Sequence, residues 1–326
     1  MDLLQSLTTI PRLSAAEWPT LPAITQYLVM VRAAVLVMTL ISALVGVLMA
    51  ASDGYFHAGR LVALLIGLLA AHATNNLIND LVDSSQGLDT GDYLRRRYGV
   101  HVLEEGLVGR VQFAWIIAGT GAVAVAAGSW LVLDLGENTL WLMIAGAFFV
   151  VFYTWPLKHF ALGELAVLLV WGPLMTAGSY YVMAGVVPAP VLLLSLAYGI
   201  GPTLVILGKH IDKLEQDRGK GVRSLPVALG ERGSRYLSLA LVALQWVMLG
   251  FVCTAWQDFW LIVTVLAVPP LLDLVRALWA PKPHQKPEQY PDAIWPLWFS
   301  AFAFRYTRDF GGLLVLALAL RAVASW

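Results

Sequence analysis

The sequence has little charge and almost no cysteine. Of its 326 residues 13% are charged, the formal net charge is zero, and Cys253 is the single cysteine. One cysteine excludes an intrachain disulfide and a cluster of cysteine ligands around a metal. The zero net charge lacks the basic excess of nucleic-acid-binding proteins, so no nucleic-acid partner is expected. Residues 1–22 also lack the apolar core of a cleavable signal peptide.

Apolar residues are abundant instead. Hydrophobic residues make up 59% of the chain and its mean hydropathy is +0.73, whereas soluble domains are about 45–50% apolar. The chain is therefore predicted to be an integral membrane protein. A membrane-crossing helix needs about 20 apolar residues. Such runs lie at residues 24–51, 59–79, 111–133, 139–155, 162–185, 188–208, 235–255, 257–279 and 309–325.

These runs predict an all-α, multi-pass bundle of about nine transmembrane helices. Residues 1–23 are expected to form an N-terminal cytoplasmic segment, and residues 24–326 one transmembrane domain. The connections after the odd-numbered spans carry no lysine or arginine, whereas those after the even-numbered spans carry several, as at residues 209–235, or at least Lys158. The positive-inside rule then places the even-numbered connections and the N-terminus in the cytoplasm.

The first polar cluster follows the second predicted span. It contains Asn76, Asn79, Asp80 and Asp83, and continues to Gly87, Asp89 and Thr90. The spacing of Asn76, Asp80 and Asp83 places them on one face of a helix. Carboxylates are costly at membrane depth, so their presence at a span end indicates a functional site, and oxygen ligands of this kind suit Mg²⁺. The alternative is that Asp80 and Asp83 only cap or solvate a helix end.

A second cluster follows the sixth predicted span. Asp212, Glu215 and Asp217 lie among basic residues, and the motif continues to Gly221, Arg223 and Ser224; the nearby cations are Lys209, Lys213, Arg218 and Lys220. Mixed acidic and basic groups fit a diphosphate that metal ions and cations hold together. The alternative is an ordinary positive-inside loop with scattered ion pairs. Because an even number of spans separates the two clusters, both are expected on the cytoplasmic side.

Other residues are weaker candidates. Lys158 is the only cation of its connection, and it either contacts a phosphate or extends to the membrane surface. Aromatic faces can stabilise an allylic cation, and the tyrosines that we expect near a cavity are Tyr153, Tyr180, Tyr181 and Tyr198. The histidines show no metal-ligand spacing, although His210 lies next to Lys209 and close to Asp212. Glu164 lies where a span begins, a place that favours an acidic residue.

Together these features suit an isoprenoid diphosphate, which has an apolar tail and an anionic head group. An apolar cavity with two acidic loops at one mouth would accommodate both parts. Mg²⁺ would stabilise the leaving diphosphate, an electron-rich partner would capture the allylic cation, and the helices would exclude water. The expected partners are thus an isoprenoid diphosphate, a hydrophobic acceptor and the lipid bilayer.

The motifs resemble those of the UbiA superfamily of intramembrane aromatic prenyltransferases. The segment from Asn76 to Thr90 is most similar to the branch that prenylates 1,4-dihydroxy-2-naphthoate in menaquinone biosynthesis. The segment from Asp217 to Gly230 resembles the second signature of the superfamily, and residues 162–181 also resemble that branch. The resemblance covers roughly residues 24–325, and it implies nine helices around a central cavity that opens sideways to lipid.

The resemblance also implies roles for individual residues. Asn76, Asp80 and Asp83, with Asn79 adjacent, would hold one Mg²⁺, for which Mn²⁺ can substitute. Asp217 and Asp212 would hold a second ion. The diphosphate would contact Lys158, Lys209, Lys213 and Arg223, while Arg32 would reach the acceptor. Tyr153 is an expected catalytic residue, and Tyr180 and Tyr181 are expected to bind substrate.

The sequence departs from the superfamily pattern at two places. The second signature usually reads Asp-x-x-x-Asp, whereas here Lys213 fills the expected position of the first aspartate. Either the loop carries an extra residue or Glu215 substitutes. In addition, Arg32 is followed by Ala-Ala-Val rather than by the Pro-x-Thr common in the naphthoate branch. Two alternatives therefore stay open beside quinone-precursor prenylation: a terpene cyclase or a prenyltransferase with another acceptor, and more remotely a lipid transporter or binding protein.

Overall fold

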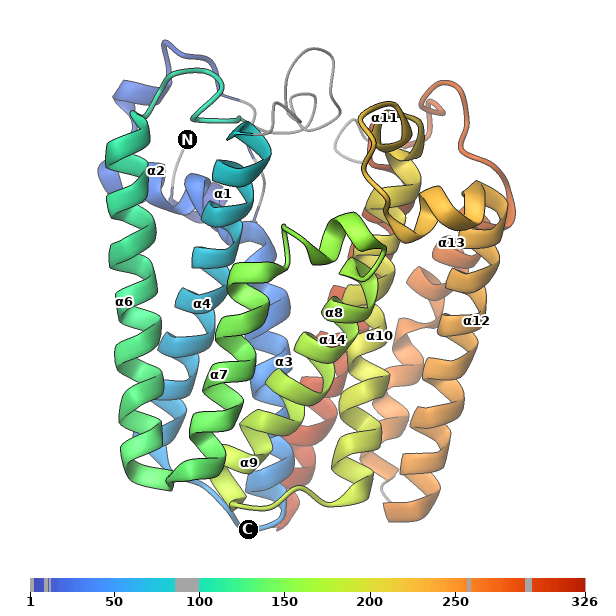
Figure 1. Cartoon of the computed structure of the whole chain (residues 1–326). Helices are drawn as coiled ribbons and strands as arrows, with labels where there is room; N and C mark the ends of the chain where they lie inside the picture. The colour runs from blue at the N-terminus through green and yellow to red at the C-terminus, as the bar shows by residue number, and fades with distance from the viewer. Residues whose placement is uncertain are drawn as a thin grey trace.

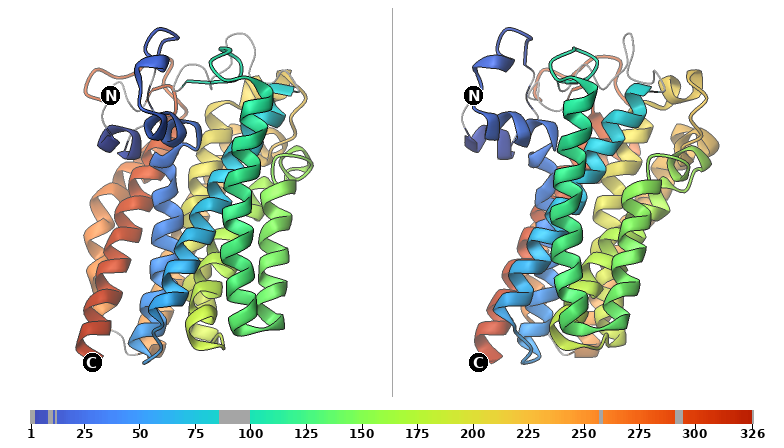
Figure 2. Two further views of the ribbon diagram at one scale, coloured as in Figure 1. Left: turned by 90° about the vertical axis from the view of Figure 1, so that its left-hand side faces the viewer. Right: turned by 60° about the vertical axis from the view of Figure 1, so that its left-hand side comes forward.

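The computed structural model describes residues 3–8, 11, 13–85, 100–256, 259–290 and 295–325. Within these ranges the chain forms helices and connecting segments, and no strand occurs. The long helices run side by side (Figure 1). The N-terminal helices and α11 lie at one end of the bundle, and the C-terminus lies at the other (Figures 1 and 2). The prediction of an all-α bundle is confirmed.

The elements follow one another along the chain without long interruptions. They are α1 (Leu3–Thr8), η1 (Trp18–Thr20), α2 (Ala23–Met30), α3 (Ala33–Ser52), α4 (Ala58–Ser85), α6 (Arg110–Leu135), α7 (Glu137–Phe152), η2 (Leu157–Phe160), α8 (Gly163–Leu169), η3 (Val170–Ala177), α9 (Gly178–Ala184), α10 (Ala189–Asp212), α11 (Leu214–Gly219), α12 (Leu225–Trp256), η4 (Phe259–Ala267), α13 (Val268–Trp279) and α14 (Trp298–Ser325).

Seven helical segments of the described chain are long and apolar enough to cross a membrane. They are α3, α4, α6, α8–η3–α9, α10, α12 and η4–α13. Helix α7 is apolar but has only 16 residues, and α14 has 28 residues but includes Arg305, Arg308 and Asp309. Both run alongside the others in Figure 1. The protein is an integral membrane protein, while a count of nine crossings stays a prediction.

The first predicted span, residues 24–51, is divided into two helices. Arg32 separates α2 from α3 and adopts a left-handed backbone with φ 55°, which is uncommon for a residue other than glycine. The break frees the carbonyl of Val31, and Asn76 Nδ2 donates a hydrogen bond to it at 2.9 Å. The Arg32 side chain pairs with Asp80. Contacts from α4 thus stabilise a break that the apolar run from residue 24 to residue 51 does not reveal.

Close helix packing holds the centre of the bundle together. Helix α10 packs against α12 and α14, and α3 packs against α14, α9 and η3. At Gly208 an added Cβ would come within 2.8 Å of backbone atoms of Phe299 and Ser300, and at Gly46 it would come within 2.1 Å of the Thr176 carbonyl oxygen. Only glycine permits backbones to approach so closely. These two crossings place α10 and α3 firmly beside the helices that line the site.

Candidate active site

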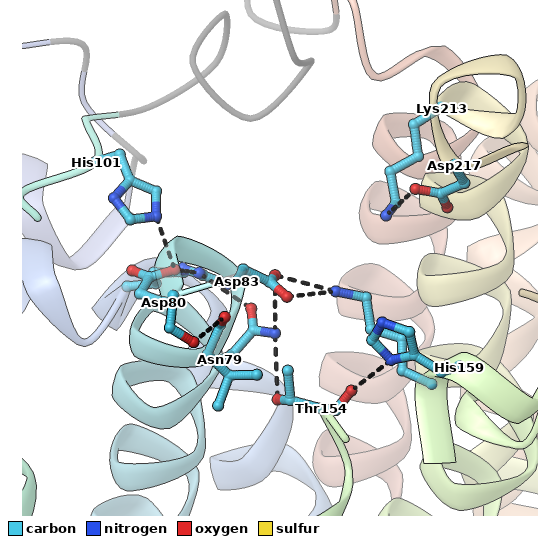
Figure 3. A network of polar contacts seen from close by, with 12 residues as sticks. Asn79, Asp80, Asp83, His101, Thr154, His159, Lys213 and Asp217 are labelled. Carbon is cyan, nitrogen blue, oxygen red and sulfur yellow. Dashed lines mark hydrogen bonds and ion pairs between the residues drawn. The ribbon is translucent and has the colours of Figure 1, made fainter. Parts of the chain in front are cut away.

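The polar face of α4 is present as predicted. Asn76, Asn79, Asp80 and Asp83 are all buried near the C-terminal end of this helix. They lie at the same end of the bundle as the second motif, and Figure 3 shows Asp80 and Asp83 on one side of the site with Asp217 on the other. The continuation of the first motif, with Gly87, Asp89 and Thr90, lies outside the described residues.

Asp80 is held between two basic side chains from other parts of the chain. The Arg32 guanidinium forms an ion pair with its Oδ1 and also donates to Asn79 Oδ1 at 3.3 Å. His101 Nε2 lies 4.0 Å from the same carboxylate oxygen. Arg32, which was predicted to reach the acceptor, therefore anchors the first acidic motif while it also lines the cavity described below.

Asp83 is paired with Lys158. The Lys158 ammonium lies 3.0 Å from both carboxylate oxygens of Asp83, and both side chains are buried, at 6% and 8% exposure. Asn79 Nδ2 donates to Asp83 Oδ2 and to Thr154 Oγ1, each at 3.2 Å. Lys158 thus points inward to the first motif and does not extend to the membrane surface.

The second motif is built on one buried ion pair. Lys213 Nζ lies 2.8 Å from Asp217 Oδ1, one helical turn along, and both residues are buried. Burial opposes ionisation of Asp217, but the Lys213 ammonium, aided by His210, outweighs that effect and lowers the pKa of the carboxyl below its usual range. The lysine in the expected position of an aspartate is therefore the partner of Asp217 (Figure 3).

Two other acidic residues of the second motif face elsewhere. Asp212 accepts hydrogen bonds from the backbone N–H groups of Phe299 and Ser300, at 3.2 and 3.0 Å, and pairs with Lys282 at 3.1 Å. It therefore stabilises the N-terminal end of α14, which corrects its expected assignment as a metal ligand beside Asp217. Glu215 is exposed and pairs with Arg218 at 2.9 Å, so it does not substitute for the missing aspartate.

A cavity of about 1160 Å³ connects this end of the bundle with its interior. This volume exceeds the range of about 300–1,000 Å³ common for ligand sites. Most of its lining is apolar and comes from α3, α4, α6, α7, α8, η3 and α10. Among the described residues, the acidic and basic side chains that line it are all cationic: Arg32, Lys158, Lys209, Lys213, Arg305 and Arg308. The partner carboxylates Asp80, Asp83 and Asp217 lie behind these cations.

Several predicted substrate contacts do not reach the cavity. Of the four expected tyrosines only Tyr153 lines it. Tyr180 donates to Asp53 Oδ2 at 2.8 Å, and Tyr198 donates to the Met38 carbonyl at 2.8 Å. Tyr181 and the exposed Arg223 are also absent from the lining. These placements correct the expectation, because the direction of a side chain around a buried helix depends on how that helix packs.

Four polar residues of the site had no informative spacing in the sequence. His101 lies beside Asp80, and Thr154 contacts Asn79. Glu164 Oε1 lies 2.6 Å from His210 Nδ1, and both residues are buried. Each of these contacts joins segments far apart in the chain. Only a position at the end of an apolar run marked Glu164, and only basic neighbours marked His210.

The oxygen donors on α4 fit a divalent ion that a diphosphate also binds. No group of three or more His, Cys, Asp or Glu side chains converges within the described ranges, so the chain does not form a closed protein cage. Mg²⁺ commonly takes one or two carboxylates together with waters and substrate phosphates. Asp80 and Asp83, with the amide oxygens of Asn76 and Asn79 on the same face, supply such a set.

The comparison with known sequences identifies the family. The sequence profile of the UbiA prenyltransferase family matches residues 39–304. The 2-carboxy-1,4-naphthoquinone phytyltransferase of Synechocystis sp. is 28% identical over 248 residues, which cover 72% of this chain and 76% of that protein. The 1,4-dihydroxy-2-naphthoate octaprenyltransferase of Bacillus subtilis is 23% identical over 222 residues, which cover 66% of this chain and 70% of that protein.

Solved structures share the fold. A UbiA homologue from Aeropyrum pernix K1 has a TM-score of 0.66 at 17% identity, with 87% of this chain and 96% of that chain covered. A UbiA homologue from Archaeoglobus fulgidus, bound to GPP and Mg²⁺, has a TM-score of 0.61 at 14% identity, with 92% and 98% covered. Since the family profile also spans most of the chain, this protein belongs to the UbiA prenyltransferase family and is a prenyltransferase.

Proposed function

We propose that the protein transfers a prenyl group from an isoprenoid diphosphate to an aromatic quinone precursor within the membrane, with Mg²⁺ as the divalent ion. The observation that carries this proposal is the charge distribution of the cavity. Its walls are apolar, while the charged side chains on its described lining are all cationic. An amphiphile with an apolar tail and an anionic head group matches both features.

The donor head group belongs at the cationic end of the cavity. Lys158, Lys209 and Lys213 line this region, and their ammonium groups suit the phosphate oxygens of a diphosphate. Lys158 and Lys213 pair with Asp83 and Asp217, and both lysines would turn partly toward the phosphates when the donor binds. This arrangement puts the anionic head group close to the oxygen donors of α4.

Asp80 and Asp83, with Asn76 and Asn79, would hold Mg²⁺, and Mn²⁺ could replace it because both ions accept oxygen ligands. When bound, the ion supplies electrostatic stabilisation of the negative charge that develops on the leaving diphosphate. Asp217 contributes a further carboxylate on the opposite side. Tyr153 lines the same cavity, where its ring can face the allylic cation.

The acceptor is proposed to be a hydroxylated naphthalene or a related quinone precursor. The names of the Synechocystis and Bacillus relatives both refer to naphthalene-ring acceptors. We also propose that both motifs face the cytoplasm, because the connections rich in lysine and arginine lie on their side of the chain. Residues 1–23 would form a cytoplasmic segment before the transmembrane domain.

The test is direct product identification. Detergent-purified protein is incubated with geranylgeranyl diphosphate, Mg²⁺ and a panel of aromatic acceptors, and the products are identified by mass. We expect a prenylated aromatic compound whose formation stops with EDTA and returns with excess Mg²⁺. The variant Asp80→Asn controls for reactions that do not need the site. Diphosphate release with a cyclic terpene product and no prenylated acceptor would replace the proposal with a cyclase, and binding without bond cleavage would indicate a lipid-binding role.

A further inference from the structure

A histidine lies on the cavity wall, deeper than the acidic motif. His72 is on α4, one helical turn before Asn76, and about 12 Å along the helix axis from Asp80 at a rise of 1.5 Å per residue. Its side chain is buried, at 7% exposure, and it lines the cavity. Most of the surrounding lining is apolar. A polar group in such a place is costly unless it has a hydrogen-bond partner or serves a ligand.

Neighbouring helices fix the orientation of this ring. Thr39 Oγ1 on α3 lies 2.7 Å from His72 Nδ1. Trp171 packs edge-on against the imidazole, with ring centroids 5.2 Å apart. Contacts on two sides prevent the ring from rotating freely. The His72 side chain is therefore pre-organised, which is expected of a group that positions a ligand.

The wall that carries Trp171 is itself irregular and well supported. Trp171 lies in η3, a π-helical segment with Pro173 inside it. The Trp171 carbonyl accepts hydrogen bonds from the hydroxyl groups of Ser42 and Thr176, each at 2.8 Å. Local π-helical geometry often marks functional sites. Here it sets the Trp171 ring against His72 on the surface of the cavity.

The second ring nitrogen of His72 is available to a ligand. Nε2 has no hydrogen-bond partner among the described residues, yet it is not fully enclosed. Because Nδ1 faces Thr39 and the residue lines the cavity, Nε2 is the ring atom that a bound molecule can reach. The indole Nε1 of Trp171 is buried and also lacks a partner within the described chain. Two polar atoms of one wall are thus unmatched by protein groups.

We propose that His72 binds a phenolic hydroxyl of the aromatic acceptor through Nε2 and holds the acceptor ring below the diphosphate. This inference rests on the proposed function. A hydroxyl group fits better than a carbonyl, because it can donate or accept and so matches either tautomer that the Thr39 contact selects. The flat Trp171 side chain beside it provides an apolar surface for an aromatic ring. His72 is thereby a substrate-binding residue that sets acceptor preference and does not contact the donor head group.

The experiment compares binding of two acceptor probes in the absence of donor. Equilibrium binding of 1,4-dihydroxy-2-naphthoate and of its dimethoxy analogue is measured anaerobically with detergent-purified wild type, His72→Leu and His72→Gln. The exposed His57, at the opposite end of α4, provides the matched control His57→Leu. We expect wild type and His57→Leu to prefer the dihydroxy compound, and His72→Leu to lose about 5- to 100-fold of that preference. His72→Gln, which retains a hydrogen-bonding amide, should keep part of it.

The outcomes separate a ligand contact from a structural role. If His72→Leu weakens binding of both compounds equally, the histidine only maintains the cavity and the inference is overturned. The same holds if the variant retains the wild-type preference. Thr39→Val gives a second route that leaves His72 intact, and it should reduce the preference in the same direction. If wild type prenylates no acceptor at all, the proposed function fails, and this result is independent of the binding ratio that tests His72.

Discussion

The buried ion pair between Asp83 and Lys158 allows a quantitative prediction. At 3.0 Å from each carboxylate oxygen, the attraction is about 5 kcal/mol at an effective dielectric constant of ~20, and desolvation of both groups offsets part of it. Removing one partner leaves a buried charge uncompensated, which costs about 3–5 kcal/mol of stability. We therefore expect Lys158→Met and Asp83→Asn each to destabilise the protein by this amount.

The double variant should lose far less than the sum of the two single losses, because it contains neither charge. We expect a coupling energy of at least about 2 kcal/mol. The assay is reversible unfolding in mixed micelles, with refolding checked for each variant so that equilibrium free energies are meaningful. Losses that simply add would refute the reasoning, since they would mean that the two groups do not interact. Saturating Mg²⁺ with diphosphate should stabilise Lys158→Met more than the double variant.

Three further predictions concern other residues. Asp217→Asn should lower prenyl transfer by about 100-fold or more in the product assay, because it removes the carboxylate that pairs with Lys213. Asp212→Ala should lower the unfolding free energy by about 1–3 kcal/mol, because the backbone N–H groups of α14 lose their acceptor, whereas activity per folded molecule should far exceed that of Asp217→Asn. Gly208→Ala should also destabilise the protein by about 1–3 kcal/mol in the same unfolding assay, because its Cβ would meet backbone atoms of α14 at 2.8 Å.

The positions of the cations also explain a feature of the site before the donor binds. Carboxylates that await a metal would repel one another if nothing neutralised them. Arg32 and Lys158, from segments far from α4 in sequence, pair with Asp80 and Asp83. We expect these cations to exchange their carboxylate partners for phosphate oxygens when the donor and Mg²⁺ bind together. The same side chains would thus stabilise the protein without its ligand and contact the substrate with it.

The sequence by itself determined the class of the protein and the location of its chemistry. Long apolar runs predict membrane helices because only a helix satisfies its own backbone hydrogen bonds in lipid. The spacing of Asn76, Asp80 and Asp83 predicts a shared face because helix geometry is local. The two motifs also occur at one end of the bundle, as the number of intervening spans predicted. These features depend on neighbouring residues alone.

Only the tertiary structure decided which side chains meet. The contact of Lys158 with Asp83 and that of Asp212 with the start of α14 join residues 75 or more positions apart. The break at Arg32 and the outward role of Tyr180 also depend on neighbouring helices. The physical reason is that an apolar helix in a bundle has no polar face to indicate its rotation, so packing between distant segments selects the direction of each side chain.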